Sequence, residues 1–338
     1  MERQPEPILT IRGLHTSFLT GSGVIPAVRG VDLHVNRGEC LGIVGESGSG
    51  KSVTFLSVLR LLAATGKIMA GEIHFEGREL TRLTQRQIRE VRGGSIAMIF
   101  QDPASSLNPL LPIGDQVGEM LWAHDKSLNR SDREARVLEL LRLVRIPEAE
   151  TRLKSYPHEF SGGMRQRVMI AMALACRPSL LIADEPTTAL DVSIQDQILK
   201  LMRGLQAELG MSIVFITHDL GVIAELCSRV IVMYGGLVME EAPIDDLFEK
   251  PLHPYTQGLL ASIPNIRQDK ARRLRPIPGS PPDMSRPPEG CPFAPRCSYT
   301  RTVCVAELPP VLTFDGSRSC RCWLCAPDAP PEDNPFHQ

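Results

Sequence analysis

The chain has 338 residues, enough for two domains or for one large domain with an appendage. Its 43% hydrophobic and 22% charged residues are typical of a globular protein, and a net charge of -2 without a long basic tract argues against a nucleic-acid partner. The longest strongly apolar stretch, near 169–176, is far shorter than the ~20 residues of a membrane span, and the N-terminus carries no signal segment. We therefore expect a cytoplasmic protein that meets a membrane only through a partner.

The first hundred residues are predicted to consist mostly of strands. The apolar run 40–44 is continuous, which is typical of a buried parallel strand. The predicted elements are strands at 8–11, 31–35 and 40–44, a glycine-rich loop at 45–52, a helix over 53–62 and strand-like patterns over 71–100.

A helical pattern follows from about residue 110 to 176. Ser161 is a suitable N-cap for a helix that runs to Ala175. Three apolar residues of an earlier helix recur on one face, namely Leu138, Leu141 and Val144. Two further buried strands are predicted, at 180–183 and 213–217.

The composition changes after about residue 250. Prolines recur over 276–295 and exclude regular structure there. The polar, proline-rich tail after Cys325 is expected to be disordered.

Residues 45–52 fit the phosphate-binding pattern G-x-x-x-x-G-K-[S/T], between a predicted strand and a predicted helix. The glycines let backbone N–H groups face the phosphates, while Lys51 is placed to reach the β- and γ-phosphates and Ser52 to bind Mg²⁺. The alternative is a chance glycine-rich turn, which the strand and helix on either side disfavour. The predicted nucleotide-contacting residues are Gly45, Glu46, Ser47, Gly48, Ser49, Gly50, Lys51 and Ser52.

The predicted strand 180–183 ends in two acids, Asp184 and Glu185. Adjacent carboxylates at the end of a buried strand are unfavourable unless they meet a metal ion or take up a proton. Asp184 is placed to hold Mg²⁺, directly or through water, and Glu185 to polarise the attacking water as a general base. The alternative is a strand that ends in two solvated acids.

The heptad SGGMRQR at 161–167 lies between the phosphate loop and the acidic strand. With these motifs the chain resembles the ATPases of ABC transporters over about residues 8 to 325. The resemblance implies an α/β P-loop NTPase with a RecA-like core, an antiparallel β subdomain, an α-helical subdomain that carries the signature and an irregular Cys-rich C-terminal extension. The implied domains are an ATPase over 8–250 with its helical subdomain at about 102–176, the extension over 251–325 and a disordered tail over 326–338.

The resemblance also assigns roles outside the phosphate loop. Gln101 matches the Q-loop, which senses Mg²⁺ and nucleotide, and His218 matches the switch histidine, which contacts the γ-phosphate; without that pattern, a lone His after a strand would be structural. Asp191 matches the D-loop at the dimer interface. The signature residues of one subunit would bind the γ-phosphate of ATP held by its partner, and they are Ser161, Gly162 and Gly163.

Phe18 is the candidate for the aromatic residue that stacks on adenine in this family. It precedes a predicted extended turn at 19–26, so a packing role is an equal alternative. In the mechanism that the resemblance implies, ATP closes the dimer and hydrolysis lets it reopen, which is a population shift driven by contacts with the γ-phosphate.

Three further segments resemble the oligopeptide and dipeptide permease ATPases, a group that includes nickel, glutathione and some sugar importers. They are QDPASSLNP at 101–109, YPHEFSGGMRQR at 156–167, and HPYT at 253–256 with GCPFAPRC at 290–297. The resemblance implies the ATP-hydrolysing subunit of a bacterial importer of di- or oligopeptides, peripheral to the cytoplasmic face of the inner membrane. Its partners would be a second, similar ATPase subunit in a pseudo-twofold dimer, two membrane permeases and, indirectly, an extracytoplasmic binding protein.

Six of the nine cysteines lie between Cys291 and Cys325, and in a cytoplasmic protein such a cluster suggests a metal site before disulfides. Four thiolates satisfy a [4Fe–4S] cluster or a structural Zn²⁺ equally well. The resemblance favours the [4Fe–4S] cluster, and six reduced thiols without metal are a further alternative. The expected ligands are Cys291, Cys297, Cys304 and either Cys320 or Cys322.

Three other functions compete with peptide import. The same ATPase role could serve nickel or another small solute, because the motifs above indicate lineage rather than cargo. A soluble ABC ATPase acting on DNA or ribosomes is disfavoured, since the chain has neither a second cassette nor a long coiled coil. A regulatory module with an inactive site is disfavoured because Lys51, Asp184, Glu185 and His218 are all in place.

Overall fold

The computed structural model describes residues 7–21, 23–102, 106–188, 190–263, 276–314 and 316–327. The chain divides into two compact units. The first comprises Met1–Ile8, Val35–Glu39 and Arg82–Phe215, and the second comprises Leu9–His34, Cys40–Thr81 and Ile216–Gln338. Within the described ranges, no helix is long and apolar enough to cross a membrane.

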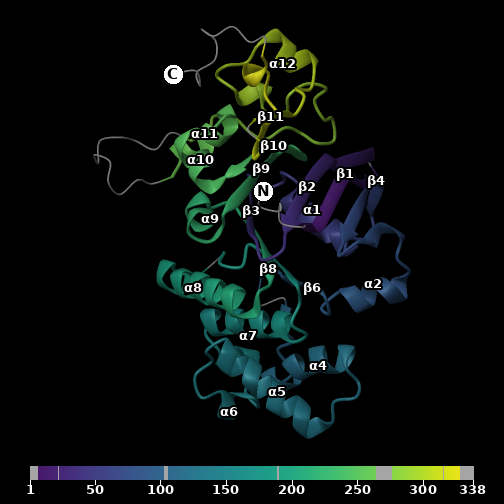
Figure 1. Cartoon of the computed structure of the whole chain (residues 1–338), viewed down its shortest axis with the longest axis vertical. Coiled ribbons are helices and arrows are strands. Elements are labelled where there is room, and N and C mark those ends of the chain that lie inside the picture. Colours follow the sequence, from purple (N-terminus) through teal and green to yellow (C-terminus); the bar gives the residue numbers. More distant parts are fainter. Residues whose placement is uncertain are drawn as a thin grey trace, which may run out of the picture. The chain divides into compact units, whose positions relative to one another are not determined.

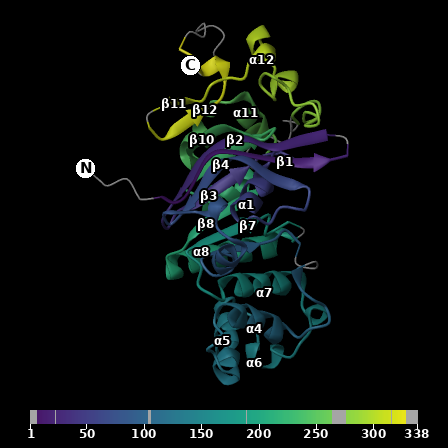
Figure 2. The ribbon, with the colours of Figure 1, turned by 90° about the vertical axis from the view of Figure 1, so that its right-hand side faces the viewer.

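The second unit contains an antiparallel sheet with the strand order β2-β1-β4-β5, whose long strands lie side by side in Figure 2. Strand β1 pairs with β4 from Leu9 opposite Phe75 to Phe18 opposite Gly66. Its residues Leu9, Ile11 and Leu14 are fully or almost fully buried, so this sheet has an apolar face. The strands are β1 (Pro7–Thr20), β2 (Gly23–Asn36), β4 (Gly66–Phe75) and β5 (Arg78–Glu79).

The same unit contains strands in the order β11-β12-β10-β9-β3. Strands β3 and β9 are parallel and, apart from Arg229 at the start of β9, apolar, whereas β10, β12 and β11 continue the sheet in antiparallel pairs. These strands are β3 (Cys40–Val44), β9 (Arg229–Tyr234), β10 (Leu237–Pro243), β11 (Leu312–Phe314) and β12 (Arg318–Cys320).

The helices of the second unit are short, and Figure 1 shows α10 and α11 beside the strands of the sheet. The α-helices are α1 (Lys51–Val58), α9 (Leu220–Leu226), α10 (Ile244–Glu249), α11 (Pro254–Ala261) and α12 (Thr302–Ala306). Three-residue 3₁₀ turns are η1 (Leu80–Arg82), η3 (Ala294–Arg296) and η4 (Trp323–Cys325).

The first unit joins parallel strands to a group of helices. Strands β6 and β7 pair in parallel from Ile96 opposite Leu180, and β8 follows β7 in the strand order. Helix α7 packs against α4 and α5, and Figure 1 shows this helical group as one cluster. The elements are α2 (Gln85–Val91), β6 (Ile96–Ile99), α4 (Ile113–His124), α5 (Arg130–Leu143), α6 (Ala149–Arg152), η2 (Pro157–Glu159), α7 (Gly162–Leu174), β7 (Leu180–Asp184), α8 (Val192–Leu209) and β8 (Ser212–Thr217).

The α/β class, the antiparallel sheet and the helical region before residue 176 are as the sequence predicts. Two expectations are wrong. Helix α2 interrupts the strand-like region 71–100, and its capping box between Thr84 and Gln87 was the overlooked signal. The C-terminal extension is not simply irregular, because β11 and β12 add to the sheet beside β10. Most of the expected disordered tail, 328–338, lies outside the described residues.

Candidate functional site

The phosphate loop leaves β3 at Val44 and enters α1 at Lys51. Two of its glycines have positive φ angles and no room for a side chain. At Gly45 (φ 152°) a Cβ would lie 2.2 Å from the carbonyl oxygen of Met233, and at Gly50 (φ 98°) it would lie 2.5 Å from that of Ala27. Both positions therefore require glycine, so the loop closes tightly over neighbouring backbone.

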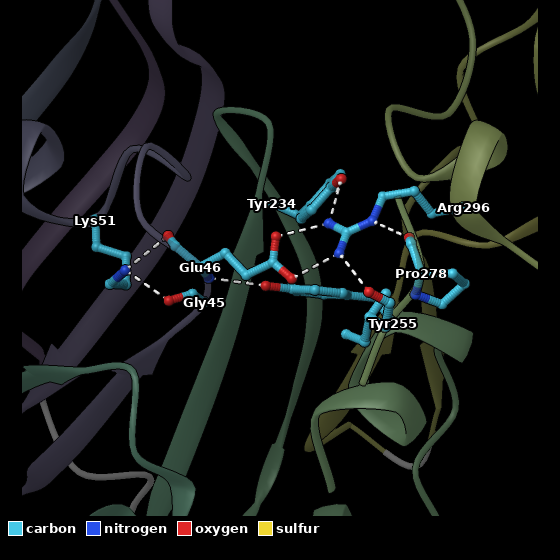
Figure 3. A network of polar contacts seen from close by, with 8 residues as sticks. Gly45, Glu46, Lys51, Tyr234, Tyr255, Pro278 and Arg296 are labelled. Atoms are coloured by element: carbon cyan, nitrogen blue, oxygen red, sulfur yellow. Dashed lines mark hydrogen bonds and ion pairs between the residues drawn. The ribbon is translucent and has the colours of Figure 1, made fainter. Parts of the chain in front are cut away.

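The N-terminus of α1 is suited to bind an anion. Its N-cap, Gly50, has no side chain that could compete with an external acceptor for the first backbone N–H groups of the helix. The Nζ of Lys51 is buried in the loop and donates to the carbonyl oxygens of Gly45 at 2.7 Å and Glu46 at 3.0 Å (Figure 3). Ser52 is half-buried in the first turn, while Ser47 and Gly48 are exposed at the tip of the loop.

The acidic pair lies where β7 ends in the first unit. Asp184 is the last strand residue and is 8% exposed. Glu185 adopts a left-handed backbone with φ 47°, a strained conformation for a residue with a side chain. Its Oε2 accepts hydrogen bonds from Nε2 of Gln101 at 3.1 Å and from Oγ1 of Thr188 at 2.9 Å. The structure thus brings the predicted Q-loop glutamine and the predicted base together.

The signature residues form the start of α7. Ser161 is the N-cap, as predicted, and its Oγ accepts a hydrogen bond from the backbone N–H of Met164 at 3.3 Å. A Cβ at Gly163 would lie 2.7 Å from Cγ2 of Ile194, so the beginnings of α7 and α8 are in close contact. Ser161 and Gly162 are exposed, which leaves them accessible to an external ligand.

Asp191 begins α8 as its N-cap. Its carboxylate accepts hydrogen bonds from the backbone N–H of Ile194 at 2.9 Å and from the hydroxyl of Ser193 at 2.8 Å, and these bonds lower its pKa. The predicted D-loop aspartate therefore has a structural role in addition to any role at an interface. Ala189 of that motif lies outside the described residues.

His218 and the phosphate loop line one pocket of about 570 Å³ in the second unit. His218 is exposed just after β8, and Gly45 and Glu46 form the loop side of this pocket. The ring of Phe18 packs on Gly66 of β4, 3.0 Å from the position a Cβ would take there. That contact gives Phe18 a packing role and does not test stacking on adenine.

The predicted site residues thus fall into two groups. The first unit holds Gln101, Ser161, Gly162, Gly163, Asp184, Glu185 and Asp191, and the second holds Phe18, the loop from Gly45 to Ser52, and His218. Sequence reasoning missed Thr188, which contacts Glu185, and also Tyr255 and Arg296, which contact Glu46. The last two lie in the segments HPYT and GCPFAPRC, which had been read only as marks of lineage.

Two family models match the chain. The ABC transporter model covers residues 28–188, and the model of the oligopeptide/dipeptide transporter C-terminal region covers residues 239–304. The first match spans the phosphate loop, the signature and the acidic pair. The chain belongs to the ABC transporter family as an ATPase, with the C-terminal region found in its oligopeptide and dipeptide group.

Similar proteins cover nearly the whole chain. A probable peptide ABC transporter ATP-binding protein, y4tR of Sinorhizobium fredii, is 52% identical over 94% of this chain and 94% of its own. The oligopeptide transport ATP-binding protein OppD of Bacillus subtilis is 49% identical over 97% and 92%, and the dipeptide transport protein DppD of the same organism is 49% identical over 94% and 95%.

Solved structures agree on the fold. A dimeric ATP-binding cassette in a post-hydrolysis state, bound to ADP and Pi, has a TM-score of 0.63 and 30% identity, covering 70% of this chain and 98% of its own. The cbiO1 protein of Clostridium perfringens, part of the ABC transporter complex cbiONQ, has a TM-score of 0.61 and 30% identity, covering 72% and 91%.

The predicted iron–sulfur cluster, with zinc as its alternative, is wrong. Among the residues that the structure describes, no group of three or more His, Cys, Asp or Glu side chains is arranged to hold a metal ion. The matched families and the relatives are named for transport and ATP binding alone. The free cysteines are largely buried, and Cys320 and Cys322 form a small core with Leu324. Burial raises the pKa of Cys291 to about 12, and the proposed ligands Cys297 and Cys304 are likewise free cysteines.

Proposed function

We propose that this chain is the ATP-hydrolysing subunit of an ABC importer for di- and oligopeptides, held at the cytoplasmic face of the inner membrane by its permeases. One observation carries the proposal: the similarity to peptide-transport ATPases extends over 94–97% of the chain. It therefore includes the oligopeptide/dipeptide C-terminal region as well as the nucleotide-binding motifs. We propose an ATPase domain over 8–250 and an extension over 251–325; the second match, 239–304, overlaps both.

The phosphate loop is proposed to bind the triphosphate of ATP. Lys51 would exchange its bonds to loop carbonyls for the β- and γ-phosphates, and the backbone N–H groups at the start of α1 would face the same oxygens. Ser52, Asp184 and Gln101 supply the hydroxyl, carboxylate and amide oxygens that Mg²⁺ prefers. When bound, Mg²⁺ neutralises phosphate charge. Phe18 remains the proposed partner of the adenine ring.

Glu185 is proposed as the general base for the attacking water. The bonds from Gln101 and Thr188 fix the orientation of its carboxylate, and the end of β7 fixes its backbone. A positioned base contributes about 10²–10⁴-fold to rate. His218, on the pocket beside Glu46, is proposed to contact the γ-phosphate.

The complete site is proposed to need a second ATPase subunit. The start of α7, with exposed Ser161 and Gly162 and buried Gly163, would bind the γ-phosphate held by the partner, and Asp191 would lie at the same interface. The dimeric state of a solved relative bound to ADP and Pi supports this arrangement. The other proposed partners are a pair of permeases and, indirectly, an extracytoplasmic peptide-binding protein.

The test is uptake of labelled di- and oligopeptides in cells that lack the gene. Complementation with wild type or with the matched exposed control Glu208→Gln should restore uptake. Glu185→Gln should not, because ATP turnover by the assembled importer is expected to fall by about 100-fold or more. Undiminished turnover in Glu185→Gln would refute the base assignment. Normal peptide uptake without the gene would instead move the cargo to nickel or another solute.

A further inference from the structure

Glu46, the second residue of the phosphate loop, is bound on every polar group by other parts of the second unit. Its backbone N–H donates to Oη of Tyr255 at 2.8 Å, and its carbonyl oxygen accepts from Nζ of Lys51 at 3.0 Å. Its carboxylate accepts two bonds from the guanidinium of Arg296, at 2.6 and 3.0 Å (Figure 3). Both Tyr255 and Arg296 come from the chain after residue 250, so this region directly contacts the nucleotide-binding loop.

The side chain of Arg296 is buried and is held by several hydrogen bonds. Its side chain is 5% exposed, at the end of η3. Besides the two bonds to Glu46, it donates from Nε to the carbonyl oxygen of Pro278 at 2.8 Å and from Nη1 to Oη of Tyr234 at 3.0 Å. A planar fork with several fixed donors is a geometry that arginine supplies and lysine does not.

The same guanidinium also bonds to a second residue that lines the pocket beside His218. Its Nη2 donates to the carbonyl oxygen of Ile277 at 3.3 Å. The residues that line this pocket are Gly45, Glu46, His218, Leu259, Ser262, Pro276 and Ile277. Arg296 therefore bonds to two residues that line this pocket, Glu46 of the phosphate loop and Ile277.

The ion pair between Glu46 and Arg296 affects how the phosphate loop binds an anion. A carboxylate within a loop that receives a polyphosphate repels the ligand unless a cation neutralises it. Glu46 is half-buried, so water screens its charge less than at an open surface. The paired guanidinium balances that charge and fixes the carboxylate on the side of the extension.

We propose that Arg296 is a positioning residue for the phosphate loop, through which the C-terminal extension sets the affinity of this subunit for ATP. Arg296 does not touch the nucleotide in this role. It acts by neutralising Glu46 and by fixing the loop that carries Lys51. The inference rests on the nucleotide site proposed above.

The test measures binding of a fluorescent ATP analogue to the full-length chain as wild type, Arg296→Gln, the double variant Arg296→Gln/Glu46→Gln and the exposed control Arg286→Gln. Arg296→Gln should weaken binding by about tenfold or more, because it leaves the carboxylate unpaired beside the phosphates. The double variant has no unpaired charge and should recover to within about threefold of wild type. Arg286→Gln lies in the same region and should bind as wild type does.

A second readout separates positioning from mere stabilisation of the fold. In the assembled importer, Arg296→Gln should raise KM for ATP and leave kcat at saturating ATP unchanged. Wild-type affinity in Arg296→Gln, or a double variant that binds as weakly as the single one, would overturn the proposal. If Arg296→Gln does not fold, Arg296→Lys, which keeps the charge and loses the fork, and the double variant decide the same point. Failure of the wild-type chain to bind the analogue would overturn the proposed nucleotide site itself.

Discussion

Glu185 combines a strained backbone with two side-chain hydrogen bonds. A residue with a Cβ at φ 47° is in a region that glycine occupies without cost, and the bonds from Gln101 and Thr188 hold the side chain there. The structure therefore holds the Glu185 carboxylate in a fixed orientation, although the left-handed backbone at this residue lowers the stability of the fold. Functional sites commonly store strain of this kind, so the observation supports the proposed role of Glu185 independently of its sequence motif.

Two substitutions measure that strain. Glu185→Ala and Glu185→Gly both remove the carboxylate and its two bonds, but only alanine keeps a Cβ in the left-handed region. We expect the glycine variant to be more stable by about 1 kcal/mol. Urea unfolding of the two purified proteins gives the difference in the free energy of unfolding. An alanine variant as stable as the glycine variant would show that the left-handed backbone of Glu185 stores no strain.

In helix α8, Asp191 combines an observed capping role with a proposed role at an interface. Asp191 caps the helix through Ile194 and Ser193, and it is also the proposed D-loop aspartate. Asparagine caps helices as well as aspartate does, whereas alanine does not. Substitution can therefore separate the two roles.

We expect Asp191→Asn to keep the melting temperature of wild type at neutral pH and Asp191→Ala to lower it. The pKa of Asp191 is lowered in the folded state, chiefly by the backbone N–H of Ile194. Its carboxylate therefore contributes fully above the ordinary pKa of 3.8, and the contribution is lost as the pH falls below that value. Thermal melts of wild type and Asp191→Asn between pH 7 and about pH 3 would check this. Because the hydrogen bond from Ile194 favours the ionised carboxylate, wild type should lose more stability than Asp191→Asn on acidification.

At the scale of the whole chain, local patterns predicted local structure. Continuous apolar runs predicted β3 and β7, and the capping residue Ser161 placed the start of α7 correctly. The phosphate-binding pattern correctly predicted the loop between β3 and α1, because the positions that require glycine are set by the local backbone conformation. The contact between Gln101 and Glu185 was not predicted, because 84 residues separate the two and the sequence assigned them only separate roles.

The features that the sequence did not predict depend on distant partners. Strands β11 and β12 have three residues each, too few to show a periodic pattern, and they form because β10 offers an edge. Arg296 and Glu46 are 250 residues apart, so no local signal joins them. The cysteines were interpreted by their spacing as ligands, whereas burial turns Cys320 and Cys322 into small apolar side chains.

The pairing of β12 with β10 covers the backbone of a strand that could otherwise pair with a second molecule. Strand β10 is an outer strand of the ladder formed with β9, and β12 and then the short β11 cover it. A chain that ends at Pro310 would leave the N–H and C=O groups of β10 open to pairing with another molecule. We expect that chain to self-associate in sedimentation velocity, while a chain ending at Pro327, which keeps β11 and β12, stays dispersed. Equal behaviour of the two chains would show that β10 is no template for intermolecular sheets. By covering β10, strands β11 and β12 would thus keep this ATPase from self-associating.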